Sequence, residues 1–333
     1  MAEGPQHFSD DVAQARARFL GACDRIGLRV ASFPGRAPVP SDGPRVGRAS
    51  TAIYCDVARL GSPEATNMLV LCSGAGGGAG FAGAGVATGV IAGGLIRDLP
   101  RDVSCLLVHA VNPLGPVWPA ASEEAAAPGD AAYPPALSAD WSDGMLSAAE
   151  RRFAAYEEAQ RFDRERLAGR TLASLAPPAW GAEVLDAIAK AHLTEKRRLL
   201  FLDIRTGPGP FAEIERLAPA GPGCGKAEAA ERWLGLPLAK GAGALADTAV
   251  PVAGGLPLRV RDGACEMASV LLEAGTYSMA TLLQASGPSS GRPAGKADGG
   301  GVIAAYPREG RWREALWDAA ADIICRGFKG LAG

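Results

Sequence analysis

One long stretch of the chain, from Met68 to Ile96, contains no Asp, Glu, Lys or Arg. It is long enough to span a bilayer, so a membrane segment is the first interpretation to consider. Its middle, however, is mostly glycine and alanine, which contribute little to insertion, and no basic cluster flanks it. We therefore interpret it as a buried βα unit: a strand over Asn67–Cys72, a tight glycine loop, and a helix over about Ala82–Ile96.

The rest of the chain also alternates between helical and strand patterns. Helical spacing is found in residues 8–27, 146–169 and 311–331. Strand patterns are found in residues 50–61, 66–74, 102–113 and 265–276. Residues 180–207 show a helical pattern followed by a strand pattern. This alternation favours an α/β fold, which we expect to be a single domain over 1–333 with a mixed, mostly buried central sheet and helices on both faces. We expect residues 113–143 to form a long loop and residues 286–301 a mobile low-complexity loop.

Charge and cysteine content exclude several classes of protein. The 34 basic and 36 acidic residues give a net charge of −2, so the chain lacks the basic surface of a nucleic-acid-binding protein. Seven scattered cysteines form no C-x-x-C pair, which argues against a zinc ribbon or a redox motif. The segment "MAEGPQHFSDD" is no secretory signal, so we expect a reduced, cytoplasmic setting with no membrane or nucleic-acid partner.

The glycine loop itself matches a dinucleotide fingerprint, because Gly78, Gly80 and Gly83 fit G-x-G-x-x-G. In a dinucleotide-binding domain the next strand should end in an acid for the ribose, yet this strand ends in "VHAVNP". A loop so dense in glycine also matches the pattern easily. The two Gly-Lys pairs lack the rest of a phosphate loop, and G-x-S-x-G is absent. Nucleotide binding therefore stays the weakest of three functional hypotheses.

Five segments in a fixed order carry a more specific resemblance: "FSDDVAQARARFL", "YCDVARLGSPEATNMLVLCSG", "LLVHAVNPLGPVW", "FLDIRTGPGPFAEI" and "LLEAGT". Together with the closing "AAYPREGRWREALW…GFKGLAG", they resemble the bacterial domain-of-unknown-function family 2817, whose fold is similar to the zinc carboxypeptidases. The resemblance covers nearly the whole chain. It implies that the strands ending at Cys72, Val111, Ile204 and Leu272 lie together centrally, with their following segments at one edge.

The resemblance also implies where a zinc ion would bind, and none of its ligands is present here. The family motif S-G-x-H-G-x-E-G corresponds to residues 73–80, where Gly76 replaces the His and Ala79 replaces the Glu. The third ligand, the His of D-x-H-T-G, is replaced by Arg205. Glycine and alanine offer no donor atom, and an arginine cannot be deprotonated to bind metal. We therefore expect no metal and no cofactor.

The same comparison yields the candidate site residues. Glu273 matches the family's general base, and His109 in "HAVNP" is a second catalytic candidate. The candidate ligand-binding residues are Ser73, Gly76, Gly77, Asn112, Asp203 and Arg205. No Arg or Lys occurs from Asp102 to Glu150, so the segment that should hold a substrate carboxylate cannot do so. We expect the guanidinium of Arg205 to enter the former metal cavity and pair with Glu273 or Asp203, since a buried charge must be paired.

These observations leave two stronger hypotheses for function. In the first, the protein is a carboxypeptidase-like pseudoenzyme that has lost zinc and acts by binding a small molecule, a peptide or a protein partner. In the second, it is a metal-independent hydrolase or transferase that uses Glu273, Arg205 and His109 in the same cleft.

Overall fold

The computed structural model describes residues 4–10, 12–35, 53–74, 81–111, 179–207, 210–219, 225–239, 255–260, 263–276 and 306–333. The predicted loop 113–143, the predicted helix 146–169 and the predicted mobile loop 286–301 lie outside these residues. So do Gly76, Gly77, Ala79 and Asn112.

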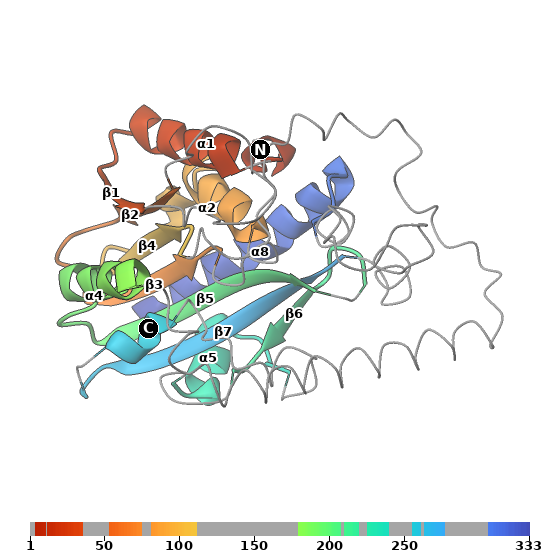
Figure 1. Cartoon of the computed structure of the whole chain (residues 1–333). Helices are drawn as coiled ribbons and strands as arrows, with labels where there is room; N and C mark the ends of the chain where they lie inside the picture. The colour runs from red at the N-terminus through yellow and green to blue at the C-terminus, as the bar shows by residue number, and fades with distance from the viewer. Residues whose placement is uncertain are drawn as a thin grey trace, which may run out of the picture.

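A seven-stranded mixed sheet organises the described part of the chain (Figure 1). Its strands are β1 (Val30–Gly35), β2 (Ile53–Leu60), β3 (Asn67–Cys72), β4 (Val103–His109), β5 (Arg198–Gly207), β6 (Ile214–Leu217) and β7 (Glu266–Gly275). They lie in the order β1-β2-β4-β3-β5-β7-β6. The central strands β4, β3, β5 and β7 are parallel, while β1, β2 and β6 pair antiparallel at the edges. The predicted mixed sheet, with the four named strands at its centre, is confirmed.

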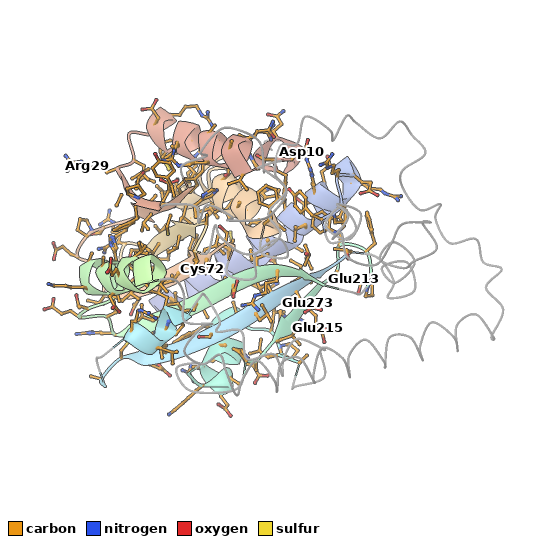
Figure 2. The ribbon with its side chains drawn as sticks, in the orientation of Figure 1. Asp10, Arg29, Cys72, Glu213, Glu215 and Glu273 are labelled. Carbon is orange, nitrogen blue, oxygen red and sulfur yellow. The ribbon has the colours of Figure 1, made fainter. Side chains whose placement is uncertain are left out.

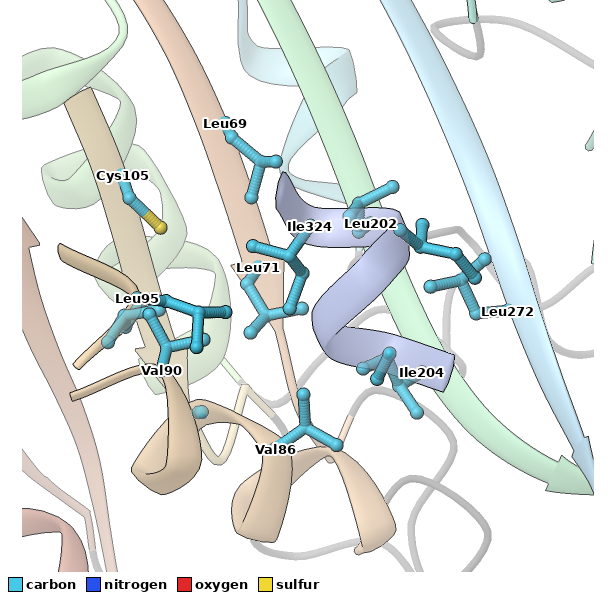
Figure 3. Close-up of a cluster of buried hydrophobic side chains, with 14 of the residues drawn as sticks. Leu69, Leu71, Val86, Val90, Leu95, Cys105, Leu202, Ile204, Leu272 and Ile324 are labelled. Atoms are coloured by element: carbon cyan, nitrogen blue, oxygen red, sulfur yellow. The ribbon is translucent and has the colours of Figure 1, made fainter. Parts of the chain in front are cut away.

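One face of the sheet carries the larger core. The helices on this face are α1 (Val12–Arg25), α2 (Ala82–Ala92), α5 (Ala227–Leu234) and α8 (Gly310–Ala332). Figure 3 shows Leu71 of β3 and Leu202 of β5 directed toward Ile324 of α8, with Val86 of α2 beside them. Burial of these side chains stabilises the face by about 25 cal/mol for each Å² of apolar surface removed from water.

The opposite face is covered by α4 (Ala179–His192), whose Leu185 and Ile188 pack on Val70 and Phe201 of the central strands. Successive side chains of a strand point to opposite faces. The apolar residues of β3 and β5 therefore divide between the two cores, and the buried apolar run of β5 covers Leu199–Leu202. The predicted helices on both faces are confirmed.

The uncharged stretch is the βα unit that its composition indicates. All six residues of β3 are buried, and α2 packs on α1 and α8 rather than facing outward. The helix is shorter than predicted: it ends at Ala92, and a short 3-10 helix follows at Leu95–Asp98, because Gly94 takes a positive φ of 77°. Among helices of the described ranges, not one has the length and hydropathy needed to span a bilayer.

The first and last described segments are joined. The hydroxyl of Tyr306 donates a hydrogen bond to the carbonyl of Ser9 (3.0 Å), and Arg313 of α8 pairs with Asp10 at 2.6 Å. The 3-10 helix Gly4–His7 packs against α8 as well. The N-terminal segment is thus held by the C-terminal helix as well as by Arg18 of α1, which donates hydrogen bonds to the carbonyls of Gln6 and Phe8.

Candidate functional site

The four central strands bring the predicted site segments to one edge of the sheet. Cys72, the last residue of β3, pairs with Asp203 of β5, and Arg205 pairs with Glu273 of β7. Ser73 follows β3 directly, and its backbone N–H donates to the carbonyl of Val108 (3.1 Å). In parallel strands the carboxyl ends meet at the same edge, which is where such folds place ligands.

Asp203 and Arg205 form a buried ion pair at this edge. The Arg205 Nη2 atom lies 2.7 Å from Oδ2 of Asp203, and the two side chains are 4% and 0% exposed. Because the residues are two apart on β5, both side chains project from the same face. Of the two partners expected for Arg205, the structure places Asp203 in contact. Glu273 is its neighbour across the strand pair.

Glu273 is the buried carboxyl of the site. The residue is 5% exposed, and within the described residues no hydrogen-bond partner reaches its Oε2 atom. Burial raises the pKa of the Glu273 carboxyl to about 7, and the nearby Glu215 raises it further, while Arg205 acts in the opposite direction. Near neutral pH this group can therefore either donate or accept a proton.

Gly207 makes room for that carboxyl, a role that the sequence reasoning missed. A Cβ atom at Gly207 would lie 2.2 Å from Oε1 of Glu273 and 2.3 Å from its Cδ. Only glycine leaves that space empty. The signal was present in the sequence, since Gly207 ends the "DIRTG" segment, but its purpose needed the partner strand.

A pocket of about 410 Å³ opens beside Glu273. Its described lining consists of Pro210, Glu213, Ile214, Glu215, Arg216, Ala239, Glu273 and Gly275. Figure 2 shows Glu213 and Glu215 on the β6 side of the pocket and Glu273 on β7. Neither Glu213 nor Glu215 was a predicted site residue, because the four-residue strand β6 was not predicted.

Ser73 is buried and engaged by the backbone. Its Oγ atom accepts a hydrogen bond from the N–H of Ala110 (3.1 Å) and lies 3.5 Å from the carbonyl of Val108. Gly83 of α2 covers it, since a Cβ there would be 3.0 Å from the Ser73 Cβ. The hydroxyl ties the end of β3 to the end of β4, which is a structural function.

His109 lies on the opposite face of the sheet from Glu273. It stacks on Phe19 of α1 with ring centroids 4.7 Å apart, inside the larger core. Burial lowers the pKa of His109 to about 4; Asp56 raises this pKa and Arg16 lowers it. The structure therefore does not bring His109 together with Glu273 and Arg205, and the three cannot act on one ligand in this arrangement.

Cys72 points into the smaller core, so it is a poor nucleophile. It is fully buried, and burial together with the nearby Asp203 and Cys55 raises the pKa of its thiol well above the usual value. Figure 2 places it on the central sheet, away from the pocket-lining Glu215.

The residues present do not fit the zinc ion that the resemblance implies. Arg205, at the position of the third ligand, brings a positive charge already bonded to Asp203. Within the ranges described, no three His, Cys, Asp or Glu side chains are arranged to hold a metal. A tetrahedral zinc site needs three or four such donors.

A family profile described as "Protein of unknown function (DUF2817)" matches residues 8–125 and 176–289, which is more than half of the chain. The chain belongs to this family. The matched ranges include β3, β5 and β7, and hence Ser73, Arg205 and Glu273. The family resemblance inferred from the sequence segments is thereby confirmed.

Two solved structures are also similar to this DUF2817 chain. One is described as a succinylglutamate desuccinylase/aspartoacylase from Shewanella frigidimarina NCIMB 400, with 16% identity, a TM-score of 0.33, and coverage of 76% of this chain and 68% of that chain. The other, from the same described family in Shewanella amazonensis SB2B, has 15% identity and a TM-score of 0.32, covering 74% of this chain and 66% of that chain. No curated protein matches significantly.

Proposed function

We propose that this DUF2817 protein is a metal-free binding protein, a pseudoenzyme that holds a small molecule, a peptide or a partner protein at the carboxyl edge of its sheet. The observation that carries the proposal is the buried ion pair between Asp203 and Arg205. A permanent cation occupies the position where the family resemblance implies a zinc ligand. An aspartate, which would otherwise orient that ligand, is engaged by the guanidinium.

The proposal explains why a buried arginine is tolerated. A buried charge is costly unless it is paired and hydrogen-bonded, and Arg205 satisfies that requirement within β5 itself. Zinc binding at the same position would bring a second cation next to the first. The unfavourable repulsion would add to the lack of donor atoms at Gly76 and Ala79.

The test combines metal analysis with one substitution. Purified protein dialysed against zinc should carry far less than one zinc per chain, and a chelator should leave its Tm unchanged. Arg205→His should lower the free energy of unfolding by about 3–5 kcal/mol, because it leaves Asp203 buried without this partner. Adding Asp203→Asn to that variant should recover part of the loss.

Arg197→His is the matched control, because Arg197 is exposed immediately before β5. Its stability should stay within about 0.5 kcal/mol of the wild type. Stoichiometric zinc in the wild type, or wild-type stability of Arg205→His, would contradict the proposal.

A metal-independent enzyme is the second candidate, and Glu273 is the observation that favours it. Its unpartnered Oε2 atom and a pKa of about 7 suit a general acid or base. Turnover of peptides or N-acyl amino acids by chelator-treated wild type, lost in Glu273→Gln, would support this candidate over the binding protein.

A further inference from the structure

The charged residues in the described lining of the pocket are three carboxylates and one guanidinium: Glu215 and Arg216 of β6, Glu213 just before it, and Glu273 of β7. Glu213 and Glu215 come from the β6 side and are exposed, whereas Glu273 of β7 is buried. Glu215 and Glu273 lie directly opposite one another in the antiparallel pair β6–β7. Like charges at such positions repel and destabilise the pair. The arrangement therefore costs stability in the unliganded protein.

The two described arginines nearest the pocket, Arg205 and Arg216, each make a hydrogen bond to a group other than Glu273. Arg205 bonds Asp203, and Arg216 donates its Nε–H to the carbonyl of Pro237 at 3.2 Å. In the described part of the chain, nothing reaches the buried Oε2 atom of Glu273 with a hydrogen bond. Among the described residues, the buried Oε2 atom at the pocket wall therefore has two further carboxylates near it and accepts no hydrogen bond from a cation.

We propose that this pocket binds a small organic cation, with a primary ammonium or guanidinium group donating to Glu273 and Glu215. Its hydrocarbon part would pack on Ile214 and Ala239. This inference rests on the proposed binding function and names the chemical class of its ligand. The volume of about 410 Å³ suits a ligand of amino-acid or diamine size.

An organic cation fits these residues better than a metal ion. Calcium takes six or more oxygen ligands in a closed cage, and the described residues offer no group of three side chains arranged to hold a metal. An ammonium group needs only acceptors within reach of its three N–H donors, and a guanidinium pairs with a carboxylate through two parallel bonds.

Calorimetric titration of the full chain at pH 8 and low salt tests the proposal, with putrescine and agmatine as cationic probes and butanediol as a neutral one. The two amines should bind at one site per chain, and butanediol should not bind. Glu273→Gln and Glu215→Gln should each weaken binding by about tenfold or more, since each removes a charged acceptor. Glu266→Gln, at the other end of β7, is the matched control and should bind as the wild type does.

Two results would overturn the proposal: no binding of either amine at millimolar concentration, or equal affinity of the wild type, Glu273→Gln and Glu215→Gln. The exposed Glu215 keeps the test valid if Glu273→Gln fails to fold. Zinc titration separates this proposal from the one before it. Stoichiometric zinc would contradict the metal-free binding protein, whereas absence of both zinc and amine binding would contradict only the cationic ligand.

Discussion

As the pH rises, ionisation of the Glu273 carboxyl lowers the free energy of unfolding. Ionisation of an ordinary ion-paired acid has the opposite effect. Its pKa is about 7 in the folded protein, raised by burial and by Glu215 of β6 against the opposing effect of Arg205 of β5. The unfolded chain ionises this group near pH 4.5. The folded state therefore holds a proton that the unfolded state has released, and its stability falls between about pH 4.5 and pH 7.

Glu273→Gln should accordingly stabilise the unliganded protein at pH 8 by about 1–3 kcal/mol and have little effect at pH 4. Urea unfolding of both proteins at the two pH values measures this difference. Glu266→Gln, at a partly exposed residue of the same strand that pairs with Arg232, should not be stabilised at pH 8. A variant less stable than the wild type at pH 8 would mean that the ionised carboxylate is stabilised in the folded state.

The contact between Arg205 and Asp203 could be predicted because their spacing in the sequence decides which face of the strand they share. Arg205 and Asp203 are two apart in a strand, so their shared face follows from the sequence. The relation of His109 to Glu273 does not, because it depends on the register of β4 and β7 through two intervening strands. A one-residue change of register moves a side chain to the other face. The sequence could place His109 and Glu273 at the same edge of the sheet, but it could not decide whether they lie on the same face.

At the level of elements, the glycines of α2 mark close contacts with its neighbours. A Cβ atom at Gly89 would lie 2.3 Å from the ring of Trp317 in α8, and one at Gly85 would lie 2.3 Å from Phe8. Alanine is ordinarily the better helix former by about 1 kcal/mol. Helix packing therefore explains the glycines at positions 85 and 89 of α2.

Gly89→Ala should destabilise the protein by about 1–2 kcal/mol. The free-energy cost of repacking around Trp317 should exceed the stabilisation from the higher helix propensity of alanine. Gly21→Ala in α1 is the matched control. A Cβ atom there meets nothing closer than the Arg25 Nη1 atom at 3.7 Å, so this variant should gain about 0.5–1 kcal/mol. Thermal unfolding of the two variants compares them. A stabilised Gly89→Ala would contradict the packing role.

The elements missed by the sequence patterns are short or lie at an edge. β1 contains Pro34, which is tolerated only on an edge strand and breaks a strand pattern. β6 has only four residues, Ile214–Leu217, too few for a period to be recognised. Long strands such as β5 and β7 were predicted because each contains a short apolar run, Leu199–Leu202 in β5 and Val270–Leu272 in β7. Glu215 lies in β6 and Glu213 directly precedes it, so two of the three pocket carboxylates were missed together with this strand.

For the whole molecule, the buried His109 limits stability in acid. Its pKa is about 4 in the folded state against 6.5 for an ordinary histidine side chain. Burial disfavours the charged ring; Asp56 of β2 favours it and Arg16 of α1 disfavours it. As the pH falls, the His109 imidazole is therefore protonated in the unfolded chain at a higher pH than in the folded protein. The free energy of unfolding decreases from about pH 6.5 toward pH 4.

His109→Leu should remove much of that loss, about 2–3 kcal/mol between pH 7 and pH 4. Chemical unfolding across this pH range gives the comparison. His192→Gln, which changes a half-buried histidine on α4, should retain most of the wild-type slope. If His109→Leu keeps the full acid dependence, another group is responsible for it.

The position of α8 has a consequence for how the protein is made. This helix packs across β3, β4 and β5, and a Cβ at its Gly327 would touch both Leu69 and Leu200. A ribosome synthesises β3 and β4 long before it reaches residues 310–332, and chains emerge at about 5–20 residues per second. For that interval the part of the apolar face that α8 covers stays exposed, while α1 and α2 already pack on the same face. Biosynthesis of this protein should therefore depend on chaperones until its last helix arrives.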